Sequence, residues 1–156
     1  MQTGSPGHIS HFDYTGFHRY FLTFCTFCRQ RLFAAPQVVE LVLAQISRAA
    51  REQQFAVIAY CFMPDHLHLL IHGTSETSEC RRFIKATKQY SGYSYSKAFQ
   101  GVLWQRYGFE RTLRNDEETL TAARYILSNP VRANLVERIE DYPFVGSLEG
   151  ELGNLL

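Results

Sequence analysis

One stretch of the chain, residues 55–73, constrains the fold more than any other. Its first part, Phe55 to Met63, is almost wholly apolar and rich in β-branched and aromatic side chains, as is typical of a buried strand. Pro64 and Asp65 break this pattern, because proline cannot donate a ladder hydrogen bond and aspartate favours turns. A second strand-like segment then begins at His66, so the stretch predicts a β-hairpin.

The return strand of this hairpin reads His-Leu-His-Leu-Leu-Ile-His over positions 66–72. Strand side chains point alternately to the two faces of a sheet, so this order divides them into two sets. We expect one face to carry Leu67, Leu69 and Ile71, and the other to carry His66, His68, Leu70 and His72. Alternating histidines can simply solvate a strand. A pair beside a tight turn, on an otherwise apolar hairpin, equally predicts a functional site at His66 and His68.

Composition places this hairpin in an ordinary folded domain. The chain has 156 residues, of which 46% are hydrophobic and 14% aromatic, enough to build a core. No apolar run reaches the length of a membrane span, and the N-terminus lacks a signal-peptide pattern, so we expect a cytoplasmic protein without membrane association. A net charge of +1 means that any nucleic-acid-binding surface must be a local patch.

The four cysteines are expected to be reduced thiols. Cys25 and Cys28 have the spacing of half a zinc site, but no second Cys-x-x-Cys pair follows them in the sequence. Cys25 and Cys61 fall within apolar strands, which favours a role as small core residues.

The remaining elements predict an α+β fold. Asn115, followed three residues later by Glu118, has the capping-box pattern that begins a helix, and Pro130 is expected to end that helix at Ser128. Around the hairpin we expect a strand at 20–27, helices at 36–53, 78–96 and 116–128, and a further strand or turn pair at 101–109. This order predicts an antiparallel sheet with helices packed on one face. The other face, bearing the histidine pair, is expected to be open. We assign residues 1–18 to a loose arm, 19–147 to one domain and 148–156 to an irregular tail.

A nucleophile can be sought among the nine tyrosines. On a helix, a metal ligand four residues after a tyrosine lies on the same face. Only Tyr14, with His18, and Tyr125, with Asn129, have a good ligand type at that position. Tyr14 falls in the expected arm, whereas Tyr125 lies in the third helix. A buried aromatic at Tyr125 and a helix cap at Asn129 remain the simpler alternatives.

Four blocks of the chain resemble one known family. The segment CFMPDHLHLLI resembles the HUH motif, two histidines separated by one hydrophobic residue. RYFLTFCTFCRQRLF, LWQRYGFERTLR and RYILSNPVRANLV resemble the other blocks of small single-tyrosine HUH transposases, and are most similar to the branch associated with repetitive extragenic palindromes (REP). The resemblance covers residues 20–147. It implies a ferredoxin-like or RRM-like fold with the active site on the open face of the sheet.

The resemblance also implies a chemistry. A metal-dependent endonuclease and strand transferase of this kind cleaves and rejoins single-stranded or hairpin DNA through a 5′-phosphotyrosine link. By position, Tyr125 would be the catalytic nucleophile, and His66, His68 and Asn129 would bind a divalent metal, Mg²⁺ or Mn²⁺. Single-tyrosine relatives in insertion sequences can be dimers, whereas the palindrome-associated branch is expected to be monomeric, so the resemblance implies either a monomer or a homodimer.

Binding of DNA needs positive charge and stacking surfaces. The best candidates are Arg81, Arg82, Lys85 and Lys88 on the second helix, together with Trp104. A solvated helix face and a core role for Trp104 are the competing interpretations.

Two alternative functions stay open. A histidine-triad nucleotide hydrolase would need a third alternating histidine where Leu70 stands. A non-catalytic single-stranded DNA or RNA-binding module could retain all four site residues by descent.

Overall fold

The computed structural model describes residues 14–150. Its centre is a five-stranded antiparallel sheet in the order β4-β1-β3-β2-β5. The strands are β1 (Arg19–Cys25), β2 (Phe55–Met63), β3 (His66–Gly73), β4 (Phe109–Leu113) and β5 (Val145–Gly146). The α+β class is thereby confirmed, and the order of the first four strands is that of a ferredoxin-like sheet.

The hairpin forms at the centre of this sheet, as its sequence predicts. β2 and β3 pair in antiparallel register, with Met63 opposite His66 across the turn. Leu67, Leu69 and Ile71 point into one core layer, whereas Leu70 points into the layer on the opposite face. The division of β3 into an aliphatic face and a histidine face is therefore confirmed.

Two helices cover the aliphatic face. α1 (Pro36–Gln53) has the predicted bounds, begins with proline at its first position and ends at Gln54, which has a left-handed backbone (φ 61°). α2 (Cys80–Phe99) packs beside α1 and is capped at its start by Glu79, whose carboxylate accepts a hydrogen bond from the Arg82 amide. The larger hydrophobic core lies between these helices and the sheet.

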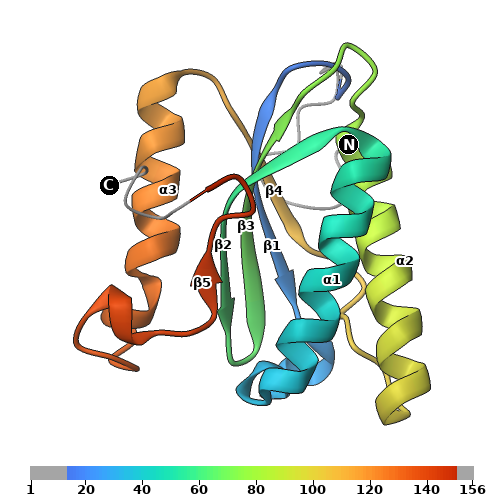
Figure 1. Ribbon diagram of the computed structural model, residues 1–156, viewed down its shortest axis with the longest axis vertical. Coiled ribbons are helices and arrows are strands. Elements are labelled where there is room, and N and C mark those ends of the chain that lie inside the picture. The colour runs from blue at the N-terminus through green and yellow to red at the C-terminus, as the bar shows by residue number, and fades with distance from the viewer. Residues whose placement is uncertain (1–13, 151–156) are drawn as a thin grey trace.

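The third helix, α3 (Asp116–Arg132), packs on the other face of the sheet, as Figure 1 shows. The expectation that this face is open is therefore wrong. Ala122, Ala123, Ile126 and Leu127 form a second core there with the small and aliphatic side chains of β2 and β3. An amphipathic helix can bury its apolar stripe against either face of a sheet, so the local sequence does not determine which face the helix covers.

The end of α3 also differs from the prediction. The helix passes through Pro130 and ends at Arg132, followed by Asn134 with a left-handed backbone (φ 59°). A proline so close to the end removes only one backbone hydrogen bond, and its ring is buried. Asn129 is consequently an internal helical residue, and its carbonyl accepts a 2.9 Å hydrogen bond from the Ala133 amide.

Three further segments differ from their predicted form. Residues 14–18 of the expected arm pack on the domain, since Tyr14 is buried against Tyr20; residues 1–13 lie outside the described range. Only one residue of the strand expected at 101–109, Phe109, belongs to β4. The start of the expected tail pairs with β2 through a 3.1 Å hydrogen bond from the Leu148 amide to the Val57 carbonyl, and residues 151–156 are outside the description.

The cysteines and helices of the described part bear on two other expectations. All four cysteines are free thiols, with Cys61 buried and Cys28 exposed. No helix between residues 14 and 150 has the length and apolar character needed to cross a bilayer.

Candidate active site

The floor of the candidate site is a row of residues that crosses three strands. Thr23 in β1 pairs with His68 in β3 on one side and with Phe109 in β4 on the other. Two residues earlier along β1, Phe21 pairs with Leu70 and Arg111 in the same way. Because side chains two positions apart share a face, both rows point toward α3.

His68 lies at the middle of this floor and is only 7% exposed. Its Nδ1 shares a 2.9 Å hydrogen bond with the Thr23 hydroxyl, and its ring packs edge-on to Phe21. Burial, with smaller effects from His66 and Arg132, lowers the pKa of His68 to about 3. The imidazole is therefore neutral at pH 7, the protonation state that a metal ligand requires.

His66 stands beside His68, with ring centroids 4.8 Å apart. Its Nδ1 lies 2.8 Å from a carboxylate oxygen of Asp65, and the other oxygen of that carboxylate accepts a 3.1 Å hydrogen bond from Arg29 Nε. Burial raises the pKa of Asp65, but hydrogen bonds from His66 and Arg29 outweigh it and bring the pKa below its ordinary value. An ionised carboxylate can only accept, so Nδ1 of His66 carries a proton, and Nε2 is the ring nitrogen that can bind a metal when the ring is neutral.

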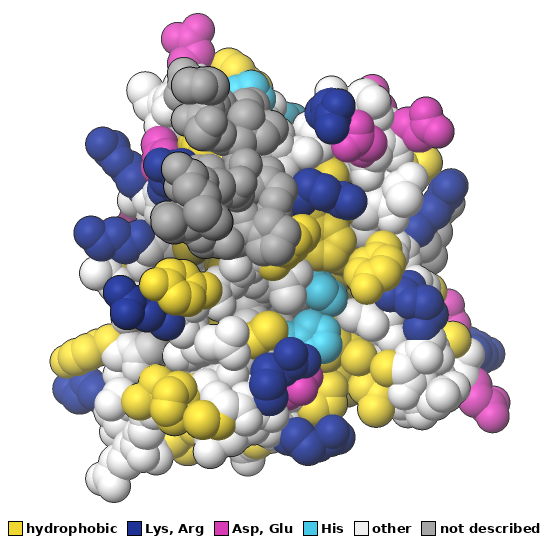
Figure 2. Space-filling view, turned by 180° about the vertical axis from the view of Figure 1, so that it is seen from behind, with side chains coloured by type: hydrophobic (Ala, Val, Ile, Leu, Met, Phe, Trp, Pro, Cys, Tyr) yellow, Lys and Arg dark blue, Asp and Glu magenta, His cyan; other side chains and the backbone are white. Residues whose placement is uncertain are grey.

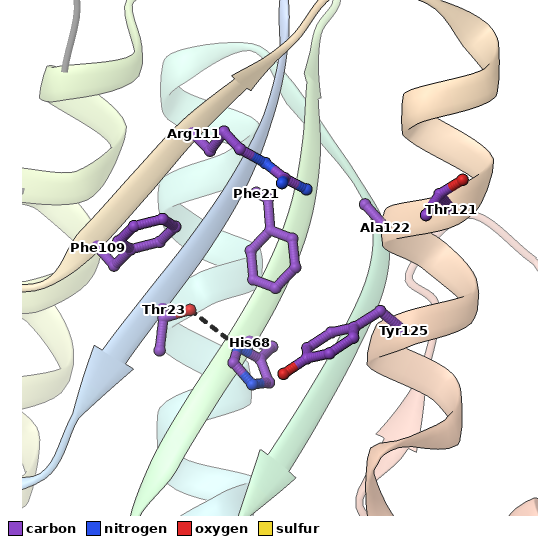
Figure 3. A pocket seen from close by; sticks show the side chains of 8 residues that line it. All are labelled: Phe21, Thr23, His68, Phe109, Arg111, Thr121, Ala122 and Tyr125. Carbon is purple, nitrogen blue, oxygen red and sulfur yellow. Dashed lines mark hydrogen bonds between the residues drawn. The ribbon is translucent and has the colours of Figure 1, made fainter. Parts of the chain in front are cut away.

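Tyr125 approaches the histidines from α3. Its ring lies 5.9 Å from the rings of both His68 and Phe21, and Figure 3 shows its hydroxyl directed toward His68. The side chain is 47% exposed, and the Arg132 guanidinium covers its ring at 4.0 Å. The alternative of a fully buried aromatic at this position is thereby excluded. An exposed phenol beside a histidine pair is accessible to a substrate.

Asn129 lies one helical turn after Tyr125, on the same side of α3. Its backbone carbonyl is used inside the helix, whereas its half-buried side chain is not needed as a cap. The structure thus brings Tyr125 to His68 and places Asn129 on the adjacent turn.

The residues fit a divalent metal in one specific way. In residues 14–150 no group of three or more His, Cys, Asp or Glu side chains is arranged to hold an ion. A site at His66 and His68 therefore needs a ligand of another type, and an amide oxygen such as that of Asn129 is suitable. The Nδ1 atoms of both histidines are engaged elsewhere, which leaves both Nε2 atoms for coordination.

A pocket of about 430 Å³ opens between β4 and α3 beside these groups. Figure 3 shows Phe109 and Tyr125 on opposite sides of it, with Phe21 and His68 between them. Phe21, Phe109 and Arg111 were not singled out by the sequence analysis. Phe109 and Arg111 lie in one of the four blocks that resemble the family, but their position beside the histidines depends on the long-range register between β1 and β4.

The proposed DNA-binding residues of α2 belong to the other layer of the fold. The Arg81 guanidinium covers the ring of Tyr14 at 4.4 Å, and Lys88 donates hydrogen bonds to the carbonyls of Gln105 and Arg106. Arg82 and Lys85 are exposed. In Figure 2, which shows the face with the histidines, Lys and Arg side chains lie along the edge over α2 as well as around the site. A role for the α2 residues in DNA binding stays a prediction.

Trp104 has a packing role. Its indole Nε1 donates a 2.8 Å hydrogen bond to the Ser91 hydroxyl, and its ring packs against Phe24 and Phe33. These contacts match the core role considered as an alternative, but Trp104 is only half-buried and also lines a pocket of about 410 Å³, so its role in DNA binding stays a prediction.

Known proteins of similar sequence and fold identify the family of this chain. The chain belongs to the family described as "Transposase IS200 like", whose model matches residues 16–129. Within that family it is similar to two proteins of the REP-associated tyrosine transposase branch. A Haemophilus influenzae protein assigned to it is 25% identical over 151 residues, which cover 85% of this chain and 81% of the relative. The Escherichia coli K12 protein is 29% identical over 102 residues, covering 64% of this chain and 58% of the relative.

Two solved structures share the fold. One is a REP-associated tyrosine transposase bound to a REP hairpin, with a TM-score of 0.73 and 19% identity over 90% of this chain and 82% of the other. The second is a Deinococcus radiodurans protein assigned as a transposase, with a TM-score of 0.53 and 23% identity over 83% and 97%. The resemblance proposed from the sequence is confirmed at the level of the family and the fold.

Proposed function

We propose that this protein cleaves and rejoins single-stranded DNA beside a hairpin, using Tyr125 as its nucleophile. The observation that carries the proposal is the position of the Tyr125 ring, 5.9 Å from His68, with its hydroxyl directed toward that imidazole (Figure 3). The family supports transposition, and a protein of the same fold has been solved with a REP hairpin. Hairpin DNA is therefore the proposed substrate class.

The proposed reaction exchanges one ester for another. The Tyr125 oxygen attacks the scissile phosphorus, the bond from phosphorus to the 3′-oxygen breaks, and a 5′-phosphotyrosine link forms. In the net step the phenolic proton is lost and the released 3′-oxygen gains one. Because the new phosphodiester retains the energy of the old one, a second 3′-hydroxyl can reverse the step and join DNA without a nucleotide cofactor.

His66, His68 and Asn129 would hold a divalent cation, Mg²⁺ or Mn²⁺, beside the phosphate. A cation bound there would polarise the phosphate and neutralise the charge that develops on it. Two imidazole ligands favour Mn²⁺ over Mg²⁺, which prefers oxygen ligands. The protein's own part is to keep both rings oriented through Thr23 and Asp65.

Covalent capture tests this function. The full chain is incubated with Mn²⁺ and a pool of hairpin oligonucleotides carrying randomised single-stranded flanks, and adducts are separated under denaturing conditions. A 3′-terminal label should migrate with the protein and a 5′-terminal label should not, because the protein retains the 5′-phosphate. EDTA and Tyr125→Phe should each abolish the adduct.

Tyr93→Phe is the matched control, since Tyr93 is an exposed tyrosine on α2 and its replacement should leave the adduct unchanged. An adduct that persists in Tyr125→Phe, or that carries the 5′ label, would overturn the assignment. Binding of the hairpins without any adduct would favour a non-catalytic DNA-binding module.

A further inference from the structure

The pocket beside Tyr125 is too apolar to be a phosphate site. Its walls are formed by the rings of Phe109 and Tyr125, and its floor includes Phe21. The one charged side chain among its lining residues is Arg111. Phosphate binding relies on several cationic or N–H donors, which this lining does not offer.

The lining is suited instead to a flat, largely apolar group. Aromatic walls on opposite sides give a ring two surfaces on which to stack. The volume of about 430 Å³ lies within the range of about 300–1,000 Å³ typical of small-ligand pockets. Besides Arg111 and His68, the polar lining residues are Thr23, whose hydroxyl shares a hydrogen bond with His68, and Thr121.

Arg111 occupies the position that a nucleotide requires for its charged part. Its guanidinium lies 5.6 Å from the centroid of the Phe21 ring and reaches across one end of the pocket, as Figure 3 shows. A base within the pocket would therefore have a cation near the phosphate attached to it.

We infer that this pocket takes one unpaired nucleobase of the DNA strand, adjacent to the phosphate attacked by Tyr125. This inference rests on the proposed function and deepens it, because it assigns a site of nucleotide selection to residues outside the histidine pair. The base stacks on Phe109, and Arg111 pairs with its phosphate. The identity of that base then contributes to the choice of cleavage position.

Selection from the hairpin pool with randomised flanks, in the absence of metal, tests the inference. The bound fraction is sequenced for wild-type protein, Phe109→Ala and Phe99→Ala; Phe99 is an exposed aromatic on α2, away from the pocket. Wild type and Phe99→Ala should share a base preference at one flanking position. Phe109→Ala should lose that preference, and its affinity for the selected hairpin should fall about tenfold.

Phe109→Leu separates stacking from folding, because leucine keeps an apolar residue in β4 without a flat face. It should retain the thermal stability of the wild type and still lose the base preference. A preference that survives in both Phe109 variants, or wild-type selection with no preferred flanking base, would overturn the inference.

Covalent capture with hairpins that carry an abasic nucleotide in the flank distinguishes failure of this inference from failure of the proposed function. Covalent adducts that form equally well with an abasic nucleotide at every flanking position would leave the function standing and refute the base pocket. A base preference that depends on Phe109, without any adduct, would support the base pocket and refute the proposed cleavage.

Discussion

The Asp65 carboxylate lies between two cations or potential cations: one oxygen is 2.8 Å from His66 Nδ1, and the other is 3.1 Å from Arg29 Nε. The Asp65 backbone carbonyl is held as well, by a 3.0 Å hydrogen bond from the Thr26 hydroxyl. The turn of the hairpin is therefore fixed from three directions. Because Asp65 is held in this way, its contact with Nδ1 also fixes the orientation of the His66 ring.

Replacement of Asp65 should weaken metal binding without unfolding the protein. Asp65→Ala removes the partner of Nδ1, and we expect an affinity for Mn²⁺ about 10- to 100-fold lower. Asp65→Asn keeps an oxygen acceptor without the charge and should give a smaller loss. Electron paramagnetic resonance titration of Mn²⁺ measures both. Glu140→Gln, in an exposed ion pair with Arg138, is the control and should bind Mn²⁺ like the wild type. Equal affinity in Asp65→Ala would show that the carboxylate does not orient His66.

Arg132 should affect the rate of adduct formation more than DNA affinity. Its guanidinium covers the Tyr125 ring at 4.0 Å and also donates to the Ser128 hydroxyl, so it restricts the rotation of the phenol. A cation–π contact at an exposed site contributes about 0.5–1 kcal/mol, which corresponds to a rate about 2- to 5-fold lower in Arg132→Ala. Single-turnover adduct formation measures the change. Arg138→Ala, outside the site, should react at the wild-type rate.

Loss of the α3 cap should lower stability. The Asn115 side chain accepts a 2.8 Å hydrogen bond from the Glu118 amide in the first turn of the helix. Asn115→Ala should reduce the free energy of unfolding by about 1 kcal/mol, which lowers the melting temperature by about 2–4 °C. Asn115→Ser restores an acceptor and should recover most of the loss. Thermal denaturation followed by circular dichroism measures the melting temperatures. Equal values for the alanine and serine variants would contradict the role of Asn115 as the helix cap.

Leu69 and Leu70 offer a matched test of the two cores. Both are fully buried neighbours in β3, but Leu69 packs in the layer with α1 and α2, and Leu70 in the layer with α3. Alanine at either position should cost about 2–5 kcal/mol. Under native conditions, hydrogen exchange should increase first in α3 for Leu70→Ala and first in α1 and α2 for Leu69→Ala. Identical exchange patterns would mean that the layers do not open separately.

Local features of this fold could be predicted from the sequence, whereas long-range ones could not. The period-two pattern of β3 and the N-cap at Asn115 depend on neighbouring residues, and both predictions are confirmed. The side of the sheet on which α3 packs depends on burial shared with β2 and β3, which no local pattern contains. Pro130 misled the prediction of the helix end because its packing outweighs one lost hydrogen bond.

The candidate site shows the same division. Tyr125 and Asn129 could be paired from helical spacing, and the structure places that face of α3 toward His68. Phe109 and Arg111 could not be assigned, because their position depends on pairing between strands about ninety residues apart.

Within residues 14–150, that pairing involves a strand with a single neighbour. In this part of the chain β4 lies at the edge of the sheet and is joined to β1 alone, through five residues from Arg19 opposite Leu113 to Thr23 opposite Phe109. A slip of one position would turn Glu110 and Thr112 toward α3 and carry Phe109 and Arg111 to the far side. Fraying of this short ladder would thus erase one wall of the pocket while leaving the imidazoles and the phenol in place, so that discrimination between substrates and the capacity to react could be lost independently.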